Sequence, residues 1–114
     1  MGQEASYDSK IVIAPEVLIT IAKLATLGVP GVAHMAPVPG GIDRYFKRGA
    51  ADGVRIQVFN HDLAADLHIV ITGDANARAV SEKVQSEVAR AMSEMVGMTA
   101  RTVNVHIENV EFAE

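Results

Sequence analysis

The fold of this chain is decided by residues 66–107, which read DLHIVITGDANARAVSEKVQSEVARAMSEMVGMTARTVNVHI. Apolar and polar side chains largely alternate over 66–71 and again over 103–107, which is the pattern of a half-buried strand. Between the two strands, Asn76 and Gly97 are residue types that begin and end helices. The stretch therefore predicts a strand, a long helix and a second strand, joined in a right-handed crossover.

The long helix is predicted to be amphipathic. Its apolar side chains recur at intervals of three or four residues, which places them on one buried face. These side chains are Val80, Val84, Val88, Met92 and Met95. The other face carries two pairs of opposite charge four residues apart, Lys83 with Glu87 and Arg90 with Glu94, and such pairs support a solvated surface.

Two further features complete the second half of the chain. Residues 54–58 alternate apolar and polar side chains, and a turn at 60–62 leads into the strand at 66–71, so we expect an antiparallel hairpin. In the last strand, Val110 and Phe112 keep the period of two in the opposite phase. This change of phase predicts a bulge near residues 108–109.

The first half is predicted to hold a strand at 10–13 and a helix that opens at residues 14–16, where Pro15 suits the first helical position. The expected buried stripe of this helix consists of Val17, Ile21, Leu24 and Ala25. Gly28 is the expected left-handed stop. A short strand is expected at 31–36, followed by an irregular segment, residues 37–52, with one helical turn around 43–47.

These elements predict an α+β fold: a two-layer sandwich in which two main helices pack on one face of a small mixed β-sheet. The expected order is β-α-(β)-β-β-α-β. Residues 1–9 are predicted to form a disordered tail, and residues 10–114 a single domain.

Composition narrows the function classes. The chain has 114 residues, a net charge of −4, 49% hydrophobic residues, 4% aromatic residues and no cysteine. The absence of cysteine excludes disulfides, thiolate metal sites and cysteine nucleophiles, and a reducing cytoplasm is the expected compartment. Residues 24–42 carry no charge, but their prolines and glycines interrupt any continuous membrane helix, so we expect no direct membrane insertion. The polar residues 1–9 do not read as a signal peptide.

Several motifs resemble one protein family. KIVIAPEV (residues 10–17), GVRI (53–56) and the late pattern VQ (84–85), MVGM (95–98) and VNVHI (103–107) resemble the alkaline shock protein family, also called the envelope stress response family. The resemblance spans residues 10–112.

This resemblance implies a small, non-enzymatic bacterial protein with a role in cell-envelope homeostasis and stress response. It implies protein partners, among them a membrane-anchored relative, homo-oligomers, and a cytoplasmic location that becomes membrane-proximal through a partner. No catalytic residue and no cofactor is implied. The surfaces expected to bind partners are the polar face of the sheet, an exposed strand edge and residues 42–51.

The histidines offer one candidate metal site. His68 and His106 fall on the polar faces of two predicted strands, and Asp66 is close to His68 in sequence, so two imidazoles and a carboxylate could hold a metal ion. An ordinary solvated sheet face explains the same pattern and is favoured. His34 and His61 are expected in exposed loops or turns.

A basic and aromatic cluster offers a candidate interaction patch. It consists of Arg44, Tyr45, Phe46, Lys47 and Arg48. Such a cluster could contact an acidic partner, anionic lipid or nucleic acid, although three cations give weak affinity and the acidic net charge makes nucleic acid an unfavoured partner.

The leading hypothesis is a non-enzymatic scaffold or interaction module. The alternatives are a small KH-like RNA-binding module and a metal- or small-ligand-binding sensor. The segment GVPG (28–31) matches the KH clamp in letters only, because its central residues are not basic and the next element is extended. The serines of the long helix lack a nucleophile-elbow sequence, which disfavours hydrolytic chemistry.

Overall fold

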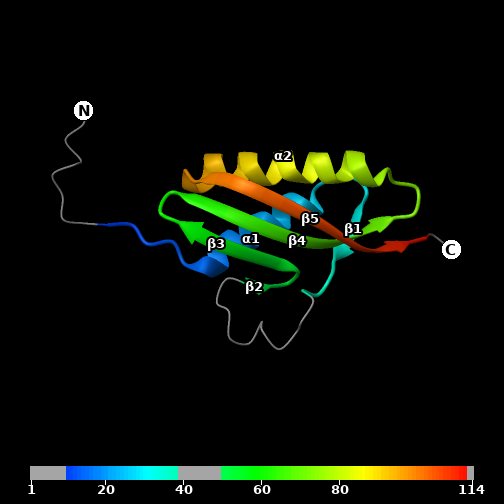
Figure 1. Cartoon of the computed structure of the whole chain (residues 1–114), viewed down its shortest axis with the longest axis horizontal. Helices are drawn as coiled ribbons and strands as arrows, with labels where there is room; N and C mark the ends of the chain where they lie inside the picture. The colour runs from blue at the N-terminus through cyan, green and yellow to red at the C-terminus, as the bar shows by residue number, and fades with distance from the viewer. Residues whose placement is uncertain (1–9, 39–49, 113–114) are drawn as a thin grey trace.

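The computed structural model describes residues 10–38 and 50–112, which form one five-stranded sheet and two helices. The elements in chain order are α1 (Pro15–Leu27), β1 (Val32–Met35), β2 (Ala50–Ala51), β3 (Val54–Phe59), β4 (Asp62–Thr72), α2 (Ala77–Val96) and β5 (Thr99–Glu111). Both helices lie on the same side of the sheet (Figure 1). The predicted two-layer α+β fold with a mixed sheet is confirmed.

Strand β4 is the centre of the sheet because it pairs with three other strands. On one edge it runs parallel to β5, from Asp62 beside Thr99 to Thr72 beside Glu111. On the other edge it pairs antiparallel first with β3 and then, further along, with β1. The long predicted helix and the two strands around it are thus confirmed as the crossover that joins β4 to β5.

The two antiparallel partners of β4 meet at the backbone of His68. Its N–H donates to the carbonyl of Gly53 and its carbonyl accepts from the N–H of Ala36, both at 2.8 Å. Gly53 and Asp52 both have positive φ, +81° and +55°, and form the two-residue turn between β2 and β3. The Asp-Gly sequence is typical of this hairpin turn. A Cβ on Gly53 would lie 2.4 Å from the carbonyl oxygen of Ala36, so the junction requires glycine.

The hydrophobic core lies between the sheet and the helices. Alternate side chains of β4, from Leu63 to Ile71, point into it and are almost fully buried. Helix α2 contributes Val80, Val84, Val88 and Met92, as predicted. Helix α1 contributes Leu18, Ile19, Ile21 and Ala22.

The ends of α2 follow the prediction. The side chain of Asn76 accepts a hydrogen bond from the N–H of Ala79 at 2.9 Å, and Gly97 ends the helix with a φ of +68°. Pro15 begins α1, also as predicted. Gly28, however, ends α1 with a φ of −78°, so the left-handed stop expected there was wrong.

Three residues predicted to be buried are exposed instead. Val17 is 45% exposed, Leu24 63% and Met95 67%. In the first three turns of α1 the polar residues are Glu16, Thr20 and Lys23, and the apolar residues between them lie on more than one face, so periodicity could not select the face that packs on the sheet. The contact with the sheet and α2 selects the side that carries Leu18 and Ala22.

The predicted strand at 10–13 is also wrong. These residues form neither a helix nor a strand, and Ile11 and Val12 are 91% and 77% exposed. An isolated extended segment is not a strand without a neighbour to share its backbone hydrogen bonds. The short strand expected at 31–36 is confirmed as β1, and the turn at 60–62 is confined to residues 60–61.

The predicted bulge in β5 is confirmed. The pairing with β4 passes from Ile107 beside Ile69 to Asn109 beside Val70, which leaves Glu108 without a partner on β4. The predicted tail at 1–9 and the helical turn at 43–47 lie outside the described residues.

Two side chains occupy backbone groups on the outer edge of β5. The amide of Gln85 donates to the carbonyl of Val103 at 3.0 Å. The side-chain oxygen of Asn109 accepts from the N–H of Val110 at 2.8 Å. Both backbone groups point away from β4, so this edge is already bonded at two places along its length.

We expect Gly53→Ala to destabilise the fold more than Gly97→Ala. Both substitutions place a side chain at a positive φ, which costs roughly 1–2 kcal/mol. A Cβ at Gly97 meets no atom within 4 Å, whereas one at Gly53 meets the backbone of Ala36. Gly97→Ala should therefore lower the free energy of unfolding by roughly 1–2 kcal/mol only, and Gly53→Ala by about 3 kcal/mol or more. Urea unfolding measures both, and equal losses would contradict the proposed role of the junction.

Candidate functional site

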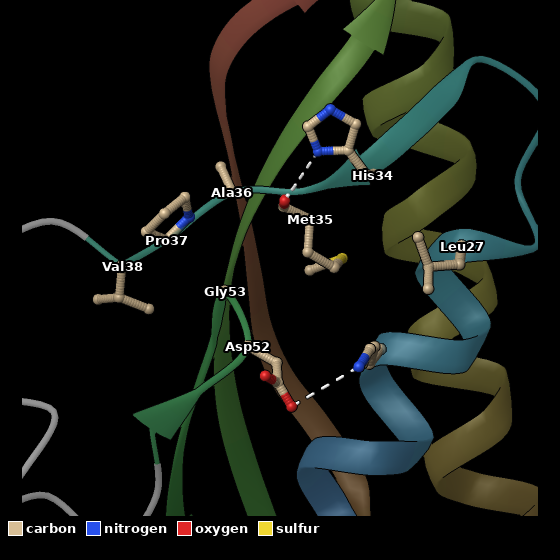
Figure 2. A pocket seen from close by; sticks show the side chains of 9 residues that line it. Leu27, His34, Met35, Ala36, Pro37, Val38, Asp52 and Gly53 are labelled. Carbon is tan, nitrogen blue, oxygen red and sulfur yellow. Dashed lines mark hydrogen bonds and ion pairs between the residues drawn. The ribbon is translucent and has the colours of Figure 1, made fainter.

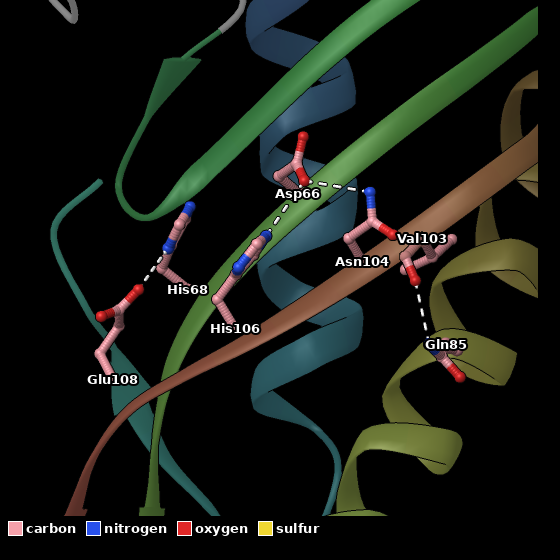
Figure 3. A network of polar contacts seen from close by, with 7 residues as sticks. All are labelled: Asp66, His68, Gln85, Val103, Asn104, His106 and Glu108. Atoms are coloured by element: carbon pink, nitrogen blue, oxygen red, sulfur yellow. Dashed lines mark hydrogen bonds and ion pairs between the residues drawn. The ribbon is translucent and has the colours of Figure 1, made fainter. Parts of the chain in front are cut away.

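The sheet face away from the helices carries a cluster of polar side chains, which we call the open face cluster (Figure 3). The cluster surrounds a hollow of about 360 Å³. The residues that line the hollow are Val38, Arg55, Asp66, His68, His106 and Glu108. They come from β3, β4, β5 and the segment that follows β1.

Parallel pairing of β4 with β5 builds the centre of this cluster. The register places Asp66 beside Asn104 and His68 beside His106. The two imidazole rings stack, with centroids 4.4 Å apart and planes inclined by 11°. One carboxylate oxygen of Asp66 accepts a hydrogen bond from the amide of Asn104 at 3.1 Å and lies 3.1 Å from Nε2 of His106.

The bulge in β5 supplies the second carboxylate. Glu108 has no partner on β4, and its Oε2 lies 2.7 Å from Nδ1 of His68. The His68 side chain is only 9% exposed. A bulge beside a polar site often redirects a side chain in this way. Each histidine of the stacked pair therefore contacts its own carboxylate.

Hydrogen bonds favour the charged forms of two side chains on this face, Asp66 and His34. Burial alone would raise the pKa of Asp66, but hydrogen bonds from His106 and Asn104 outweigh it and lower the pKa below the usual 3.8. Further along the face, the pKa of His34 is raised by the backbone carbonyl of Met35 and then by the carboxylate of Glu111. Asp66 is thus ionised at neutral pH.

The predicted metal ligands are neighbours in the structure. Asp66, His68 and His106 all line the same hollow. Within residues 10–38 and 50–112, however, no three histidine or carboxylate side chains are arranged to hold a metal ion. The two histidines contact different carboxylates, Nδ1 of His68 that of Glu108 and Nε2 of His106 that of Asp66.

The other candidate residues from the sequence lie outside the open face cluster. The patch at residues 44–48 lies outside the described residues. His61 lies in the exposed hairpin turn as expected, whereas His34 belongs to strand β1, where it is exposed. Gly28 and Gly31 connect helix α1 to strand β1 rather than two helices, which is unlike a KH clamp.

Sequence reasoning missed Arg55 and Glu108. Arg55 is the register partner of Asp66, and its Nε atom is buried without a hydrogen-bond partner. The alternation of β3 places it on the polar face, but only the hairpin register brings it beside the histidines. The sequence predicts a bulge near Glu108 but no contact for its side chain, because the direction of a bulged side chain depends on its neighbours.

Further hollows lie elsewhere in the described residues. One, of about 470 Å³, is lined by Leu27, Met35 and Pro37 among others, and the ammonium group of Lys23 lies 3.6 Å from the carboxylate of Asp52 at its rim (Figure 2). This ion pair links α1 to the turn formed by Asp52 and Gly53.

The second hollow lies between α1 and α2, has a volume of about 590 Å³ and is called the helical groove below. Its lining includes the exposed side chains of Val17, Leu24 and Met95.

Asp66→Asn tests the hydrogen bonds of the open face cluster. Because the pKa of Asp66 is lowered by folding, its ionised form stabilises the fold above the usual value of 3.8, and that contribution is lost as the pH falls through the lowered pKa. We expect the variant to be less stable than the wild type at neutral pH, with the difference shrinking below about pH 4. Urea unfolding at several pH values measures this.

The matched control is Glu82→Gln, which removes an exposed carboxylate on α2 and should leave stability nearly unchanged. If Asp66→Asn matched the wild type at neutral pH, the hydrogen bonds would have no net stabilising effect.

Two bacterial proteins are similar to this chain in sequence. The chain is 28% identical over 114 residues to the uncharacterized protein YqhY of Bacillus subtilis, covering 98% of this chain and 84% of that protein. It is 30% identical over 105 residues to the uncharacterized protein Spy1535 of Streptococcus pyogenes, covering 91% and 81%.

Known structures share the fold. A zinc form of a MamM CTD variant matches with a TM-score of 0.55 and 18% identity, and a copper form of the MamM CTD matches with 0.54 and 19%. Each match covers 87% of this chain and 86% of the other chain.

Neither helix within the described ranges combines the length and the apolar character that a bilayer crossing requires.

The profile of one family matches residues 3–112, nearly the whole chain. This confirms the resemblance found in the motifs: the chain belongs to the alkaline shock protein 23 family, which is described by a cell envelope-related function.

Proposed function

We propose that this chain is a non-enzymatic protein-interaction module in cell-envelope homeostasis, and that it binds a second protein chain through the helical groove. The observation that carries the proposal is the exposure of large apolar side chains along that groove. The envelope-related description of the family supports the cellular setting.

The groove has the features of a contact surface. Leu24 and Met95 are each about two-thirds exposed, and Val17 is nearly half exposed, although all three line one hollow. Ile21, Ala25 and Ala91 also line it and add apolar surface. Contiguous apolar surface rimmed by polar residues marks protein contacts, because covering it removes apolar area from water.

The charges beside the groove favour a second copy of this chain as the occupant. Arg90 binds Glu87 and Glu94, and Lys83 lies 3.4 Å from Glu87. The hydrogen bond from Arg90 lowers the pKa of Glu87, which therefore stays ionised. A rim that carries both signs can pair with its own image across a two-fold axis, where each cation meets an anion of the other copy.

A membrane-anchored relative of the same fold would present a similar helical layer. Binding such a relative would bring this chain to the cytoplasmic side of the membrane without a span of its own. The self-associating form and the anchored form then compete for one surface.

Leu24→Glu and Met95→Glu test the groove. We expect wild-type chain to form dimers in a concentration-dependent way, and each variant to weaken the dimer by at least about a hundredfold, because an unpaired carboxylate would be buried in the interface. Sedimentation velocity over a range of concentrations measures this, and thermal unfolding checks that the variants are folded.

Val12→Glu is the matched control, since Val12 is also a highly exposed apolar residue but does not line the groove. It should dimerise like the wild type. A wild-type chain that stays monomeric at all concentrations, or a control as impaired as the groove variants, would contradict self-association through this groove. A photo-crosslinker placed at Leu24 in cells then separates the partners: a crosslink to a membrane-anchored relative supports envelope docking, and a crosslink to RNA would support the KH-like alternative instead.

A further inference from the structure

We infer that the hollow of the open face cluster binds an oxyanion, a carboxylate or a phosphate group, between the guanidinium group of Arg55 and the ring of His68. The site lies on the sheet face opposite the helical groove. It is therefore independent of the proposed partner surface.

The first observation is the unsatisfied donor of Arg55. Its Nε atom is shielded from solvent and has no hydrogen-bond partner. Among the described residues, no other side-chain nitrogen or oxygen atom is buried without a partner. Native proteins satisfy nearly all buried polar groups, so a buried donor of this kind indicates an acceptor supplied from outside the chain. A guanidinium group is always charged and forms paired hydrogen bonds with carboxylate and phosphate oxygens.

The second observation is that the neighbouring carboxylates are already engaged. Asp66 is the register partner of Arg55, yet its contacts are with Asn104 and His106, and no ion pair joins it to Arg55 in the described residues. Glu108 contacts Nδ1 of His68 at 2.7 Å. Within residues 10–38 and 50–112, the two carboxylates that line the hollow therefore contact the histidines, and neither forms an ion pair with Arg55.

The third observation concerns the ring of His68. With Nδ1 bonded to Glu108, the other ring nitrogen lies on the side away from that carboxylate (Figure 3). When the ring is protonated, both nitrogens are donors, and Nε2 can donate to an oxyanion in the hollow. Stacking on His106 and the contact with Glu108 fix the orientation of the ring, so the donor is positioned in advance.

The hollow has the size and the wall for a small ligand. Its volume of about 360 Å³ exceeds that of a phosphate ion, and Val38 supplies an apolar wall. A small organic acid or a phosphomonoester would therefore fit better than a bare ion.

Five charged or titratable side chains face the hollow. They are Arg55 from β3, Asp66 and His68 from β4, and His106 and Glu108 from β5. Because the two carboxylates contact the histidines, the guanidinium group of Arg55 is the group among these five that an oxyanion would pair with.

The test uses the full chain labelled for NMR and titrated with inorganic phosphate, with sodium acetate and, at matched ionic strength, with sodium chloride. The signals observed are the Nε–H of Arg55 and the ring carbons of His68. At about pH 6 we expect a saturable shift with phosphate, with acetate or with both. Saturation by phosphate alone assigns a phosphate ligand, and saturation by acetate alone assigns a carboxylate.

Variants separate the site from the general surface. Arg55→Gln should abolish the shift at His68, whereas Arg78→Gln, which removes an exposed arginine on α2, should leave it unchanged. No saturable shift with either anion, or shifts equal to those given by chloride, would overturn the inference and assign the Nε–H to water. Because the wild-type Arg55 signal is read directly, that conclusion stands even if Arg55→Gln does not fold.

Discussion

The structure depends on one constraint, which is that two strands share a single edge of β4. Residues next to both strands bind the backbone of His68, Gly53 just before β3 and Ala36 just after β1, at 2.8 Å each. Only a residue without a side chain fits where they meet, since a Cβ on Gly53 would contact the carbonyl of Ala36. The junction also directs the chain from Ala36 to Val38 toward the open face, where Val38 lines the hollow beside His68. A backbone requirement thereby shapes the polar site.

The parallel pairing of β4 and β5 places like residues side by side. Asp66 meets Asn104 and His68 meets His106, so each strand supplies alternate members of one network. The two histidines stack within the part of the ladder where the register is uninterrupted, from Ala64 beside Thr102 to Ile69 beside Ile107. The bulge at Glu108 then shifts the phase and provides the carboxylate that contacts His68. The polar face is consequently an ordered arrangement of side chains, whereas an ordinary solvated face would leave them independent.

Much of the fold could be predicted from the sequence, because residues 54–112 contain clear periods, an Asn cap and a Gly stop. The closeness of Asp66, His68 and His106 followed from the crossover. The face of α1 could not be predicted, since this helix is apolar on most sides and only the neighbouring α2 and sheet decide which side is buried. The strand predicted at residues 10–13 was wrong because an apolar run has strand propensity but forms a strand only beside a neighbouring strand. The place of Arg55 beside the histidines could not be predicted because it depends on the register of the hairpin and on the burial of its Nε atom.

The bonded outer edge of β5 has a consequence for assembly. An incoming strand would need the carbonyl of Val103 and the N–H of Val110, which Gln85 and Asn109 already occupy. Growth by adding sheet to sheet along this edge would first have to break both bonds. Contacts through the helices can instead close on themselves by symmetry. Under the proposed self-association, the occupied positions on β5 would favour closed assemblies through the helices over growth along the edge of the sheet.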